Sequence, residues 1–311
     1  MKRTAAGLLA VSVVLAACAG AAGPGATRSP GASGEEGGIE RPSGDAPILT
    51  VRHEGGMLPV QLQVAELPTF VLLGDGRVIM HGMQTLEFPG PALPALIERA
   101  LTPAGVELVL DAIGGTGLFT TDLDTRGAQN FVADGLDTVF TLDAGGDVVT
   151  VRVYGLGTLD PTAGAPPGMD SGEWEAYRTL YELNDALTML ETWLPADAWE
   201  AEGWQPLEPE AFRLYVRDVT GEPVEGGDLP EQVREWPTGD DPAGFGEAAA
   251  GFDDGTRCGA VENDLAATWL AELHAANQMT LWTDDGERRF MVRARPLLPG
   301  EAATCPELPG S

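Results

Sequence analysis

Lysine is almost missing from this chain of 311 residues, and several other residue types are scarce. Lys2 is the single lysine, and there are only three histidines and three cysteines. Beyond residue 47 the only serines are Ser171 and the terminal Ser311, and neither lies in a G-x-S-x-G sequence. Serine-hydrolase chemistry at a nucleophile elbow is therefore not expected.

Positive charge is also in short supply. Lysine and arginine together number 18 against 48 acidic residues, which gives a formal net charge of −30. A codon bias that favours arginine over lysine, together with adaptation to salt, accounts for this composition, because the acids are scattered along the chain and not blocked. A surface that handles cations or binds a basic partner is the functional alternative. Because such a surface repels nucleic acid, we expect no nucleic-acid partner.

Long hydrophobic runs are absent after the N-terminus, since no later run reaches the 18 residues of a membrane-spanning candidate. The N-terminus itself has Lys2 and Arg3 followed by an apolar stretch, residues 5–15, that is too short to span a bilayer as a helix. A positive region followed by a short apolar region and small residues is typical of an export signal. Residues 1–17 are therefore predicted to be a signal peptide.

The signal ends in Leu15-Ala16-Ala17-Cys18, which resembles the lipobox of bacterial lipoproteins. The resemblance implies cleavage before Cys18 and attachment of diacylglycerol to its thiol. Several acyl chains hold a protein at a membrane where one chain does not. We therefore expect a lipid-anchored protein on the extracytoplasmic face of the cell membrane, with the membrane contacted through the acyl chains on Cys18. The alternative is an ordinary secretory signal in which Cys18 is incidental.

Removal of the signal leaves Cys258 and Cys305 as the cysteines besides Cys18. An even pair in an oxidising compartment is most simply a disulfide, so these two are predicted to be bonded. A redox-active pair is the alternative, but the close C-x-x-C spacing that tunes a thiol is missing.

Composition divides the chain into four parts. Residues 1–17 are the signal, and residues 18–47, rich in Gly, Pro and Ala, are predicted to be a disordered tether. Residues 48–195 and 196–311 are predicted to form an α+β domain and a smaller, disulfide-containing α+β subdomain. The expected fold is thus α+β, with antiparallel β-hairpins packed against amphipathic helices in one or two subdomains.

Three strand pairs flank Asp/Gly turns and predict hairpins. They are 69–73 with 77–81, 138–142 with 148–154, and 279–283 with 288–294. Further strands are predicted at 48–56, 212–219 and 257–261, and loops at 117–135 and 220–255. Helices are predicted at about 95–101, from Thr102-Pro103 to Gly114, from Asp170 to Leu194, and from Asp264 to about Ala276.

No metal or cofactor is expected. His53, His81 and His274 show no metal-binding spacing, and His274 is predicted to be exposed. The sequence from Asp122 to Gly127 begins like a calcium loop but has arginine at its fifth position. The turn aspartates of the hairpins need no catalytic explanation, because Asp side chains commonly satisfy turn backbone.

The run from Cys258 to Cys305, with Arg295-Pro-Leu-Leu-Pro-Gly-Glu301 before its last cysteine, resembles uncharacterised lipoproteins of high-GC Gram-positive bacteria. Those families have no known activity, so the resemblance identifies no catalytic residues in this chain. We expect a binding or structural role in the cell envelope and lean against an enzyme. The alternatives are the solute-binding subunit of a transporter, which parallel βαβ units would favour, and an extracytoplasmic hydrolase, which buried carboxylates with raised pKa would favour.

Overall fold

The computed structural model describes residues 41–125, 131–143, 145–200, 202–223, 230–284 and 286–306. Chain contacts separate Met1–Gly38 from a compact unit, Ile39–Ser311. The predicted signal peptide, Cys18 and most of the predicted tether therefore lie outside the described residues. The compact unit holds all described helices and strands and has its own hydrophobic cores, so it is expected to fold without the preceding residues.

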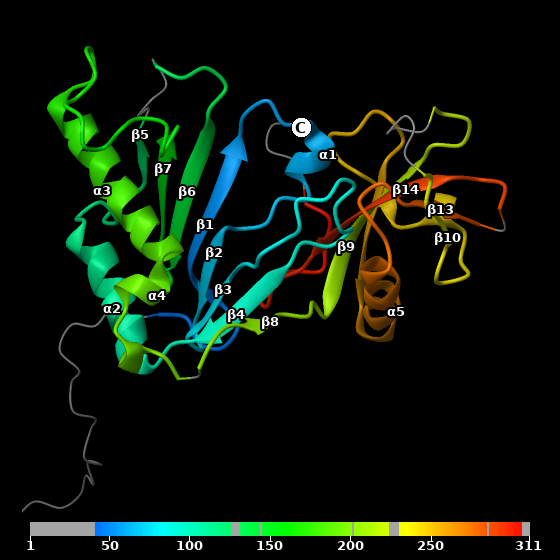
Figure 1. Ribbon diagram of the computed structural model, residues 1–311, viewed down its shortest axis with the longest axis horizontal. Helices are drawn as coiled ribbons and strands as arrows, with labels where there is room; N and C mark the ends of the chain where they lie inside the picture. Colours follow the sequence, from blue (N-terminus) through cyan, green and yellow to red (C-terminus); the bar gives the residue numbers. More distant parts are fainter. Residues whose placement is uncertain are drawn as a thin grey trace, which may run out of the picture. The chain divides into compact units, whose positions relative to one another are not determined.

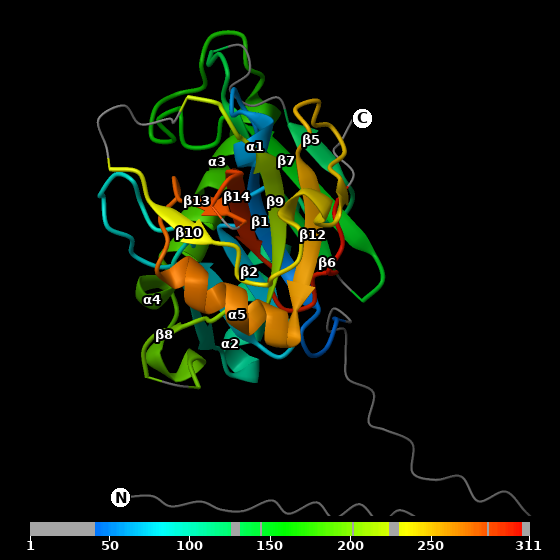
Figure 2. The same cartoon turned by 90° about the vertical axis from the view of Figure 1, so that its right-hand side faces the viewer.

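Two mostly antiparallel sheets with few helices make up the described part of the chain, which confirms the predicted α+β class (Figures 1 and 2). In spatial order the strands of the first sheet are β5 (Leu123–Thr125), β7 (Val148–Tyr154), β6 (Leu136–Asp143), β1 (Pro47–Gly55), β2 (Phe70–Leu73), β3 (Arg77–His81), β4 (Leu96–Ala100) and β8 (Gln205–Pro206). Those of the second sheet are β10 (Val233–Glu235), β13 (Leu281–Thr283), β14 (Phe290–Pro296), β9 (Ala211–Asp218), β12 (Arg257–Glu262) and β11 (Glu247–Ala248). Within the described residues, β5 with β7 and β10 with β13 are the parallel pairs.

Helices cover one face of each sheet. The α-helices are α1 (Val60–Gln63), α2 (Pro103–Gly115), α3 (Ser171–Thr188), α4 (Leu190–Trp193) and α5 (Asn263–His274). Figure 1 shows α2, α3 and α4 against the first sheet and α5 beside the second. Short 3-10 helices lie at Ala196–Ala198 and Pro242–Gly244.

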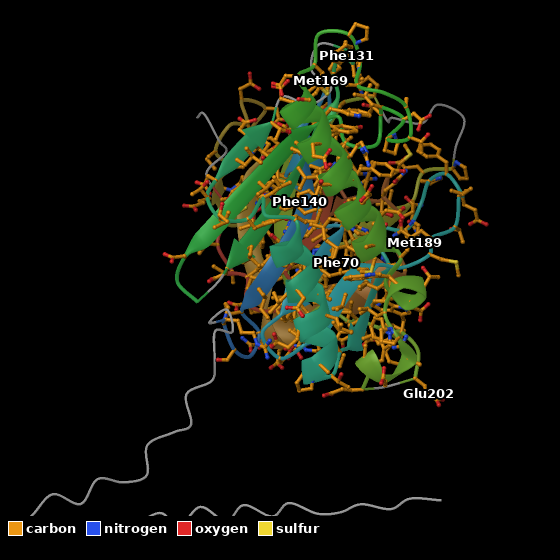
Figure 3. All side chains as sticks on the ribbon, turned by 90° about the vertical axis from the view of Figure 1, so that its left-hand side faces the viewer. Phe70, Phe131, Phe140, Met169, Met189 and Glu202 are labelled. Atoms are coloured by element: carbon orange, nitrogen blue, oxygen red, sulfur yellow. A yellow bond between two sulfur atoms is a disulfide. The ribbon has the colours of Figure 1, made fainter. Side chains whose placement is uncertain are left out.

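The larger core lies between the first sheet and helices α2 and α3. Phe70 and Phe140 of the sheet are fully buried there, and Figure 3 places both beneath the helices. The predicted caps hold the helices in place: Thr102 accepts a hydrogen bond from the N–H of Gly105 at 3.1 Å, and Asp170 caps the start of α3. Each cap satisfies a backbone donor that the helix itself cannot.

The predicted hairpins are all confirmed. Strand β2 pairs with β3, β6 with β7, and β13 with β14, each in antiparallel register. At the first turn the carboxylate of Asp75 accepts a hydrogen bond from the N–H of Arg77, and Gly76 has a φ of 89°. The backbone therefore needs glycine at this turn, and Asp75 has the structural role expected of it.

The helix predicted near residues 95–101 is wrong. These residues form β4, which pairs with β3 through partners such as Ile97 and Met80. A helix of two turns gains too few hydrogen bonds to offset the cost of its nucleation. The same residues gain a full ladder of hydrogen bonds at the open edge of β3.

The long helix predicted from Asp170 to Leu194 is interrupted. Helix α3 ends at Thr188, and α4 begins at Leu190 after Met189, whose φ and ψ are −113° and 36°. The hydroxyl of Thr188 donates to the carbonyl oxygens of Asn184 and Asp185. Such back-bonding competes with the helical ladder, which explains the break.

Two predicted loops contain strands. Residues 117–135 include β5, and residues 220–255 include β10 and β11. These strands have only two or three residues, and a pattern of apolar alternation cannot appear in so few. In the second loop Trp236 is buried, and its ring lies 4.9 Å from that of Trp269 on α5.

The chain after β14 packs on the remaining face of the first sheet. Leu298 is buried there against Val71, Ile79 and Leu96. The segments of the two sheets also meet where Pro91, between β3 and β4, and Asn277, between α5 and β13, form an isolated antiparallel bridge. Among the described helices, none has the length and hydropathy that a membrane crossing requires.

Candidate functional site

The two faces of the second sheet have opposite character. Along β9, Phe212, Leu214 and Val216 are buried in the aromatic core beneath α5. Arg213 and Arg217 alternate with them and therefore point to the other face, because successive side chains of a strand lie on opposite sides.

Strand β14 continues this pattern, because its outward side chains stand beside those of β9. The register places Met291 opposite Arg217, Arg293 opposite Tyr215, and Arg295 opposite Arg213. Four arginines therefore lie on two neighbouring strands, in a chain whose net charge is −30. We call this surface the arginine face.

One end of the arginine face is closed by the C-terminal part of the chain. Arg295, whose side chain is 9 % exposed, donates to both carboxylate oxygens of Glu301 at 2.6 and 2.8 Å. Burial acts to raise the pKa of Glu301, but the hydrogen bonds and charge of Arg295 outweigh it and hold the pKa below its ordinary value. This ion pair fixes the turn after β14 and has a structural role.

Cys258 and Cys305 close the same end of the arginine face. They lie at disulfide distance, with 1.95 Å between the sulfur atoms and 6.0 Å between the Cα atoms. Cys258 is fully buried on β12 and packs with Tyr215 in a small cluster. The structure therefore brings together the two cysteines that the sequence analysis paired.

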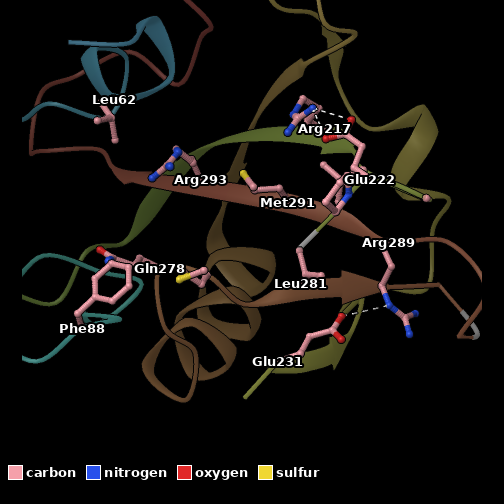
Figure 4. A pocket seen from close by; sticks show the side chains of 14 residues that line it. Leu62, Phe88, Arg217, Glu222, Glu231, Gln278, Leu281, Arg289, Met291 and Arg293 are labelled. Carbon is pink, nitrogen blue, oxygen red and sulfur yellow. Dashed lines mark hydrogen bonds and ion pairs between the residues drawn. The ribbon is translucent and has the colours of Figure 1, made fainter. Parts of the chain in front are cut away.

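The other end of the arginine face is open and forms a cavity of about 550 Å³ (Figure 4). Leu281 of β13 and Met291 of β14, which are register partners, lie side by side in its lining. Arg217, Arg289 and Arg293 also line it. The cavity therefore combines an apolar strip with guanidinium groups from two strands and the turn before β14.

Carboxylates meet the arginines at one end of the cavity, and one of them, Asp254, lies 3.6 Å from Arg217 Nε. Arg217 Nη1 donates to both oxygens of Glu222, at 2.8 and 3.0 Å. The Nε atom of Arg289 lies 3.9 Å from Glu231, and Figure 4 shows both pairs to one side of Met291. Both glutamate side chains are a little under half exposed, so these ion pairs are worth little on their own.

Leu62, Phe88 and Gln278 line the opposite end of the cavity, and Figure 4 places Arg293 on the same side of Met291 as these residues. Phe88 is 65 % exposed and Leu62 is 37 % exposed. The loop that carries Phe88 is held in place, because the N–H of Gln278 donates to the carbonyl of Gly90 at 2.9 Å. Phe88 and Leu62 therefore form a hydrophobic rim of the cavity, and the loop that carries Phe88 is ordered by a hydrogen bond within the protein.

Sequence reasoning missed this cavity, although one signal for it was present. The sequences 212–217 (FRLYVR) and 290–295 (FMVRAR) both alternate large or apolar residues with arginine. That alternation indicates strands with one arginine-bearing face. What the sequence could not supply is the pairing of these strands with Leu62 and Phe88, which lie far away in the chain.

The other residues considered in the sequence do not assemble into a second site. Burial lowers the pKa of His53 on β1, and the charge of His81 on β3 acts in the same direction. His274 is exposed at the end of α5, as predicted. Within the described ranges, no group of three His, Cys, Asp or Glu side chains could hold a metal ion. Cys18 lies outside the described residues, and so do Arg126 and Gly127 of the calcium-like sequence.

Comparisons of the whole chain with protein-family models, with curated proteins and with solved structures found no match.

Proposed function

We propose that this protein is a lipoprotein anchored by acyl chains on Cys18 at the extracytoplasmic face of the cell membrane, and that its folded part binds a ligand. The N-terminal sequence supports the anchor, because positive residues, a short apolar region and Leu-Ala-Ala-Cys follow one another as in a lipobox. The resemblance of residues 258–305 to uncharacterised lipoproteins points the same way.

The cavity beside β13 and β14 is the observation that carries the binding role. Its volume of about 550 Å³ is within the range of small-molecule sites, which combine an apolar lining with a few convergent polar groups. Leu281 and Met291 supply the apolar surface, and Arg217, Arg289 and Arg293 supply the polar groups.

The cysteine pair supports an extracytoplasmic location. Disulfides persist in oxidising compartments and are rare in the cytosol. Cys258 and Cys305 are at bonding distance and join β12 to the C-terminal part of the chain. In this proposal they are a structural disulfide formed after export.

The two alternative functions have less support. Parallel βαβ units would favour the solute-binding subunit of a transporter, whereas both sheets are mostly antiparallel. Buried carboxylates with a raised pKa would favour a hydrolase. Burial acts to raise the pKa of Asp240 and Glu301, but hydrogen bonds to the ionised carboxylates outweigh it and lower both values.

Fatty-acid labelling of the full chain in a bacterium that processes lipoproteins tests the anchor. We expect the chain to incorporate a labelled fatty acid and to fractionate with membranes, and the Cys18→Ser variant to remain unlabelled. Cys305→Ser is the matched control and should still be labelled, because its thiol has no part in anchoring. Equal labelling of the Cys18→Ser variant, or none of the unaltered chain, contradicts the proposal.

A further inference from the structure

We infer that residues 55–65 and 82–95 form a surface by which the folded unit lies against a lipid bilayer. The inference goes beyond the proposed ligand binding. It rests on the proposed location at a membrane, but its test does not need the anchor. Three observations carry it: exposed apolar side chains in both segments, the lack of charge in both, and the number of residues between Cys18 and the folded unit.

Two segments expose large apolar side chains to solvent. Residues 55–65 contain the turn after β1 and helix α1, and residues 82–95 connect β3 to β4. Half of the twelve exposed large apolar residues in the described part of the chain lie in these 25 positions. They are Met57, Leu58, Leu62, Met83, Leu86 and Phe88. Single apolar residues are ordinary on a surface, but such a concentration marks an interaction site.

Both segments leave the same end of the first sheet. Strands β1 and β3 both pair with β2 in antiparallel register, so they run in the same direction and end together. Leu62 and Phe88 also line the same cavity, and Figure 4 shows both on one side of Met291. The exposed apolar side chains therefore belong to one region of the surface.

Neither segment has the acidic character of the rest of the chain. Residues 55–65 contain no charged residue, and residues 82–95 contain a single one, Glu87. With 48 acids in 311 residues, the average frequency predicts about four acids in these 25 positions. Carboxylates are repelled by anionic headgroups and resist transfer out of water. A surface with apolar side chains and little charge can therefore approach a bilayer with a small penalty.

A bilayer fits this surface better than a second copy of the chain. Two copies that met here would each bring a net charge of about −30, and their mutual repulsion opposes association. Acyl chains on Cys18, in contrast, would keep the unit beside one bilayer at a high effective concentration. A modest affinity of the surface for lipid is then sufficient.

The chain between Cys18 and the folded unit is long enough for this contact. Cys18 and Arg41, the first described residue, are 23 positions apart, and an extended chain of that length spans up to about 80 Å. A unit of this size has a radius of gyration of about 18 Å. The anchor therefore leaves any face of the unit free to turn toward the membrane.

Vesicle titration of a fluorescent label tests the contact without the anchor. In the Ile39–Ser311 unit, where the proposed disulfide leaves no other thiol, Leu86→Cys provides the site for an environment-sensitive nitrobenzoxadiazole label. Val148→Cys is the matched control. Val148 is 56 % exposed and lies at the other end of the first sheet, because its partner strand β6 is antiparallel to β1.

The two labels should respond differently to phosphatidylcholine vesicles. The label at residue 86 should brighten saturably, with a midpoint of about 1 mM lipid, roughly tenfold weaker than binding by one myristoyl chain. Nitroxide-bearing lipids should quench it. The label at residue 148 should change in neither measurement. No response at residue 86, or an equal response at both positions, overturns the inference.

Variants and lipid composition show what drives the binding. Met83→Ser with Leu86→Ser should weaken sedimentation of the unit with the vesicles about tenfold, because apolar surface is lost, whereas Val148→Ser should change nothing. All three side chains are exposed, so urea midpoints should stay the same. Phosphatidylglycerol should weaken binding at low salt, and added salt should restore it. Stronger binding to phosphatidylglycerol would contradict an apolar contact.

Other occupants of the surface give different results. A dimer in sedimentation velocity that Met83→Ser with Leu86→Ser dissociates, without any vesicle binding, would assign the surface to a second copy and overturn the inference. A monomer that does not bind vesicles would also overturn it and would point to a protein partner.

The full chain separates failure of the contact from failure of the anchor. In the acylated chain reconstituted into vesicles, nitroxide lipids should quench the label at residue 86 and not the label at residue 148. An acylated chain in which neither label is quenched overturns the contact and leaves the anchor in place. A chain that is not acylated contradicts the proposed anchor, whereas vesicle binding by the Ile39–Ser311 unit would still support the contact.

Discussion

The two sheets of this protein differ in what covers them. The first sheet is covered by α2 and α3 on one face, while residues such as Leu298 cover only part of the other, which also carries the ion pairs of Arg152 with Glu54 and Asp137. The second sheet has an aromatic core under α5, but its other face carries arginines, the cysteine pair and a cavity. In the proposed function, the second sheet serves stability on one side and recognition on the other.

The largest expected loss of stability comes from a substitution in the core between the second sheet and α5. Trp269 is fully buried between Trp236 and Trp282. Trp269→Ala should lower the free energy of unfolding by about 3 to 5 kcal/mol, because it removes packing and leaves a cavity. Urea denaturation of the Ile39–Ser311 unit measures the change.

The control for this prediction is Trp269→Phe. The indole Nε1 atom is buried and, within the described residues, has no hydrogen-bond partner. Phenylalanine removes this unsatisfied group while keeping much of the packing, so the loss should be below about 1.5 kcal/mol. Equal losses in the two variants would contradict the account of this core.

The next effect concerns the cysteine pair on the arginine face. Cys258 and Cys305 are separated by 47 residues, so a bond between them restricts a long loop in the unfolded chain. Replacing both by alanine should lower the free energy of unfolding by about 2 to 4 kcal/mol. Reduction of the unaltered protein should reproduce that loss in a urea denaturation, and a reductant that changes nothing would show that the bond does not form.

A smaller and pH-dependent effect is expected at Arg295 and Glu301. Glu301→Gln should lower the free energy of unfolding by about 2 kcal/mol at pH 7, because charged hydrogen bonds to a buried arginine are lost. The lowered pKa of Glu301 means that its stabilisation is present above its ordinary value near 4.5 and is lost as the pH falls through the folded value. The difference between the two proteins should therefore shrink in acid.

Glu182→Gln on α3 is the control for this pair. Glu182 and Arg178 form an exposed pair at 3.7 Å. Its removal should change the free energy of unfolding by less than about 0.5 kcal/mol at any pH. If Glu301→Gln behaved in the same way, the ion pair with Arg295 would not be the anchor that the structure indicates.

The smallest effect on stability is expected at the rim of the cavity. Phe88 is 65 % exposed, so Phe88→Ala should change the free energy of unfolding by less than about 0.5 kcal/mol. A loss above 1.5 kcal/mol in urea denaturation would show that Phe88 serves the fold and not recognition. The side chains of the first sheet offer no such separation, since their burial ties them to stability.

Local chemistry explains which parts of the fold could be predicted. Asp75 with Gly76 marks a hairpin by turn geometry alone, and Thr102 with Pro103 marks the start of a helix. The strand β4 could not be predicted in this way, because its five residues become a strand only beside the open edge of β3. Tertiary pairing decided that element.

The cavity was still less accessible to sequence reasoning. Its lining comes from α1, the loop with Phe88, strands β9, β13 and β14, and the segments that follow β9 and precede β13 and β14. No spacing rule joins such segments, and arginine in strands has no motif of its own. The cysteine pair could be predicted because only two candidates remained once Cys18 was assigned to the anchor.

Methyl NMR of the Ile39–Ser311 unit with ¹³C-labelled methionine tests the central claim most directly. Met279 and Met291 line the cavity, whereas Met169 and Met189 lie on the first sheet's side of the molecule, where Figure 3 labels them. Titration with octyl glucoside, whose chain would contact the apolar strip of Leu281 and Met291, should shift the Met279 and Met291 signals saturably and leave those of Met169 and Met189 in place. Shifts confined to Met169 and Met189, or no saturable shift at all, would contradict the claim that the open end of the arginine face binds a ligand.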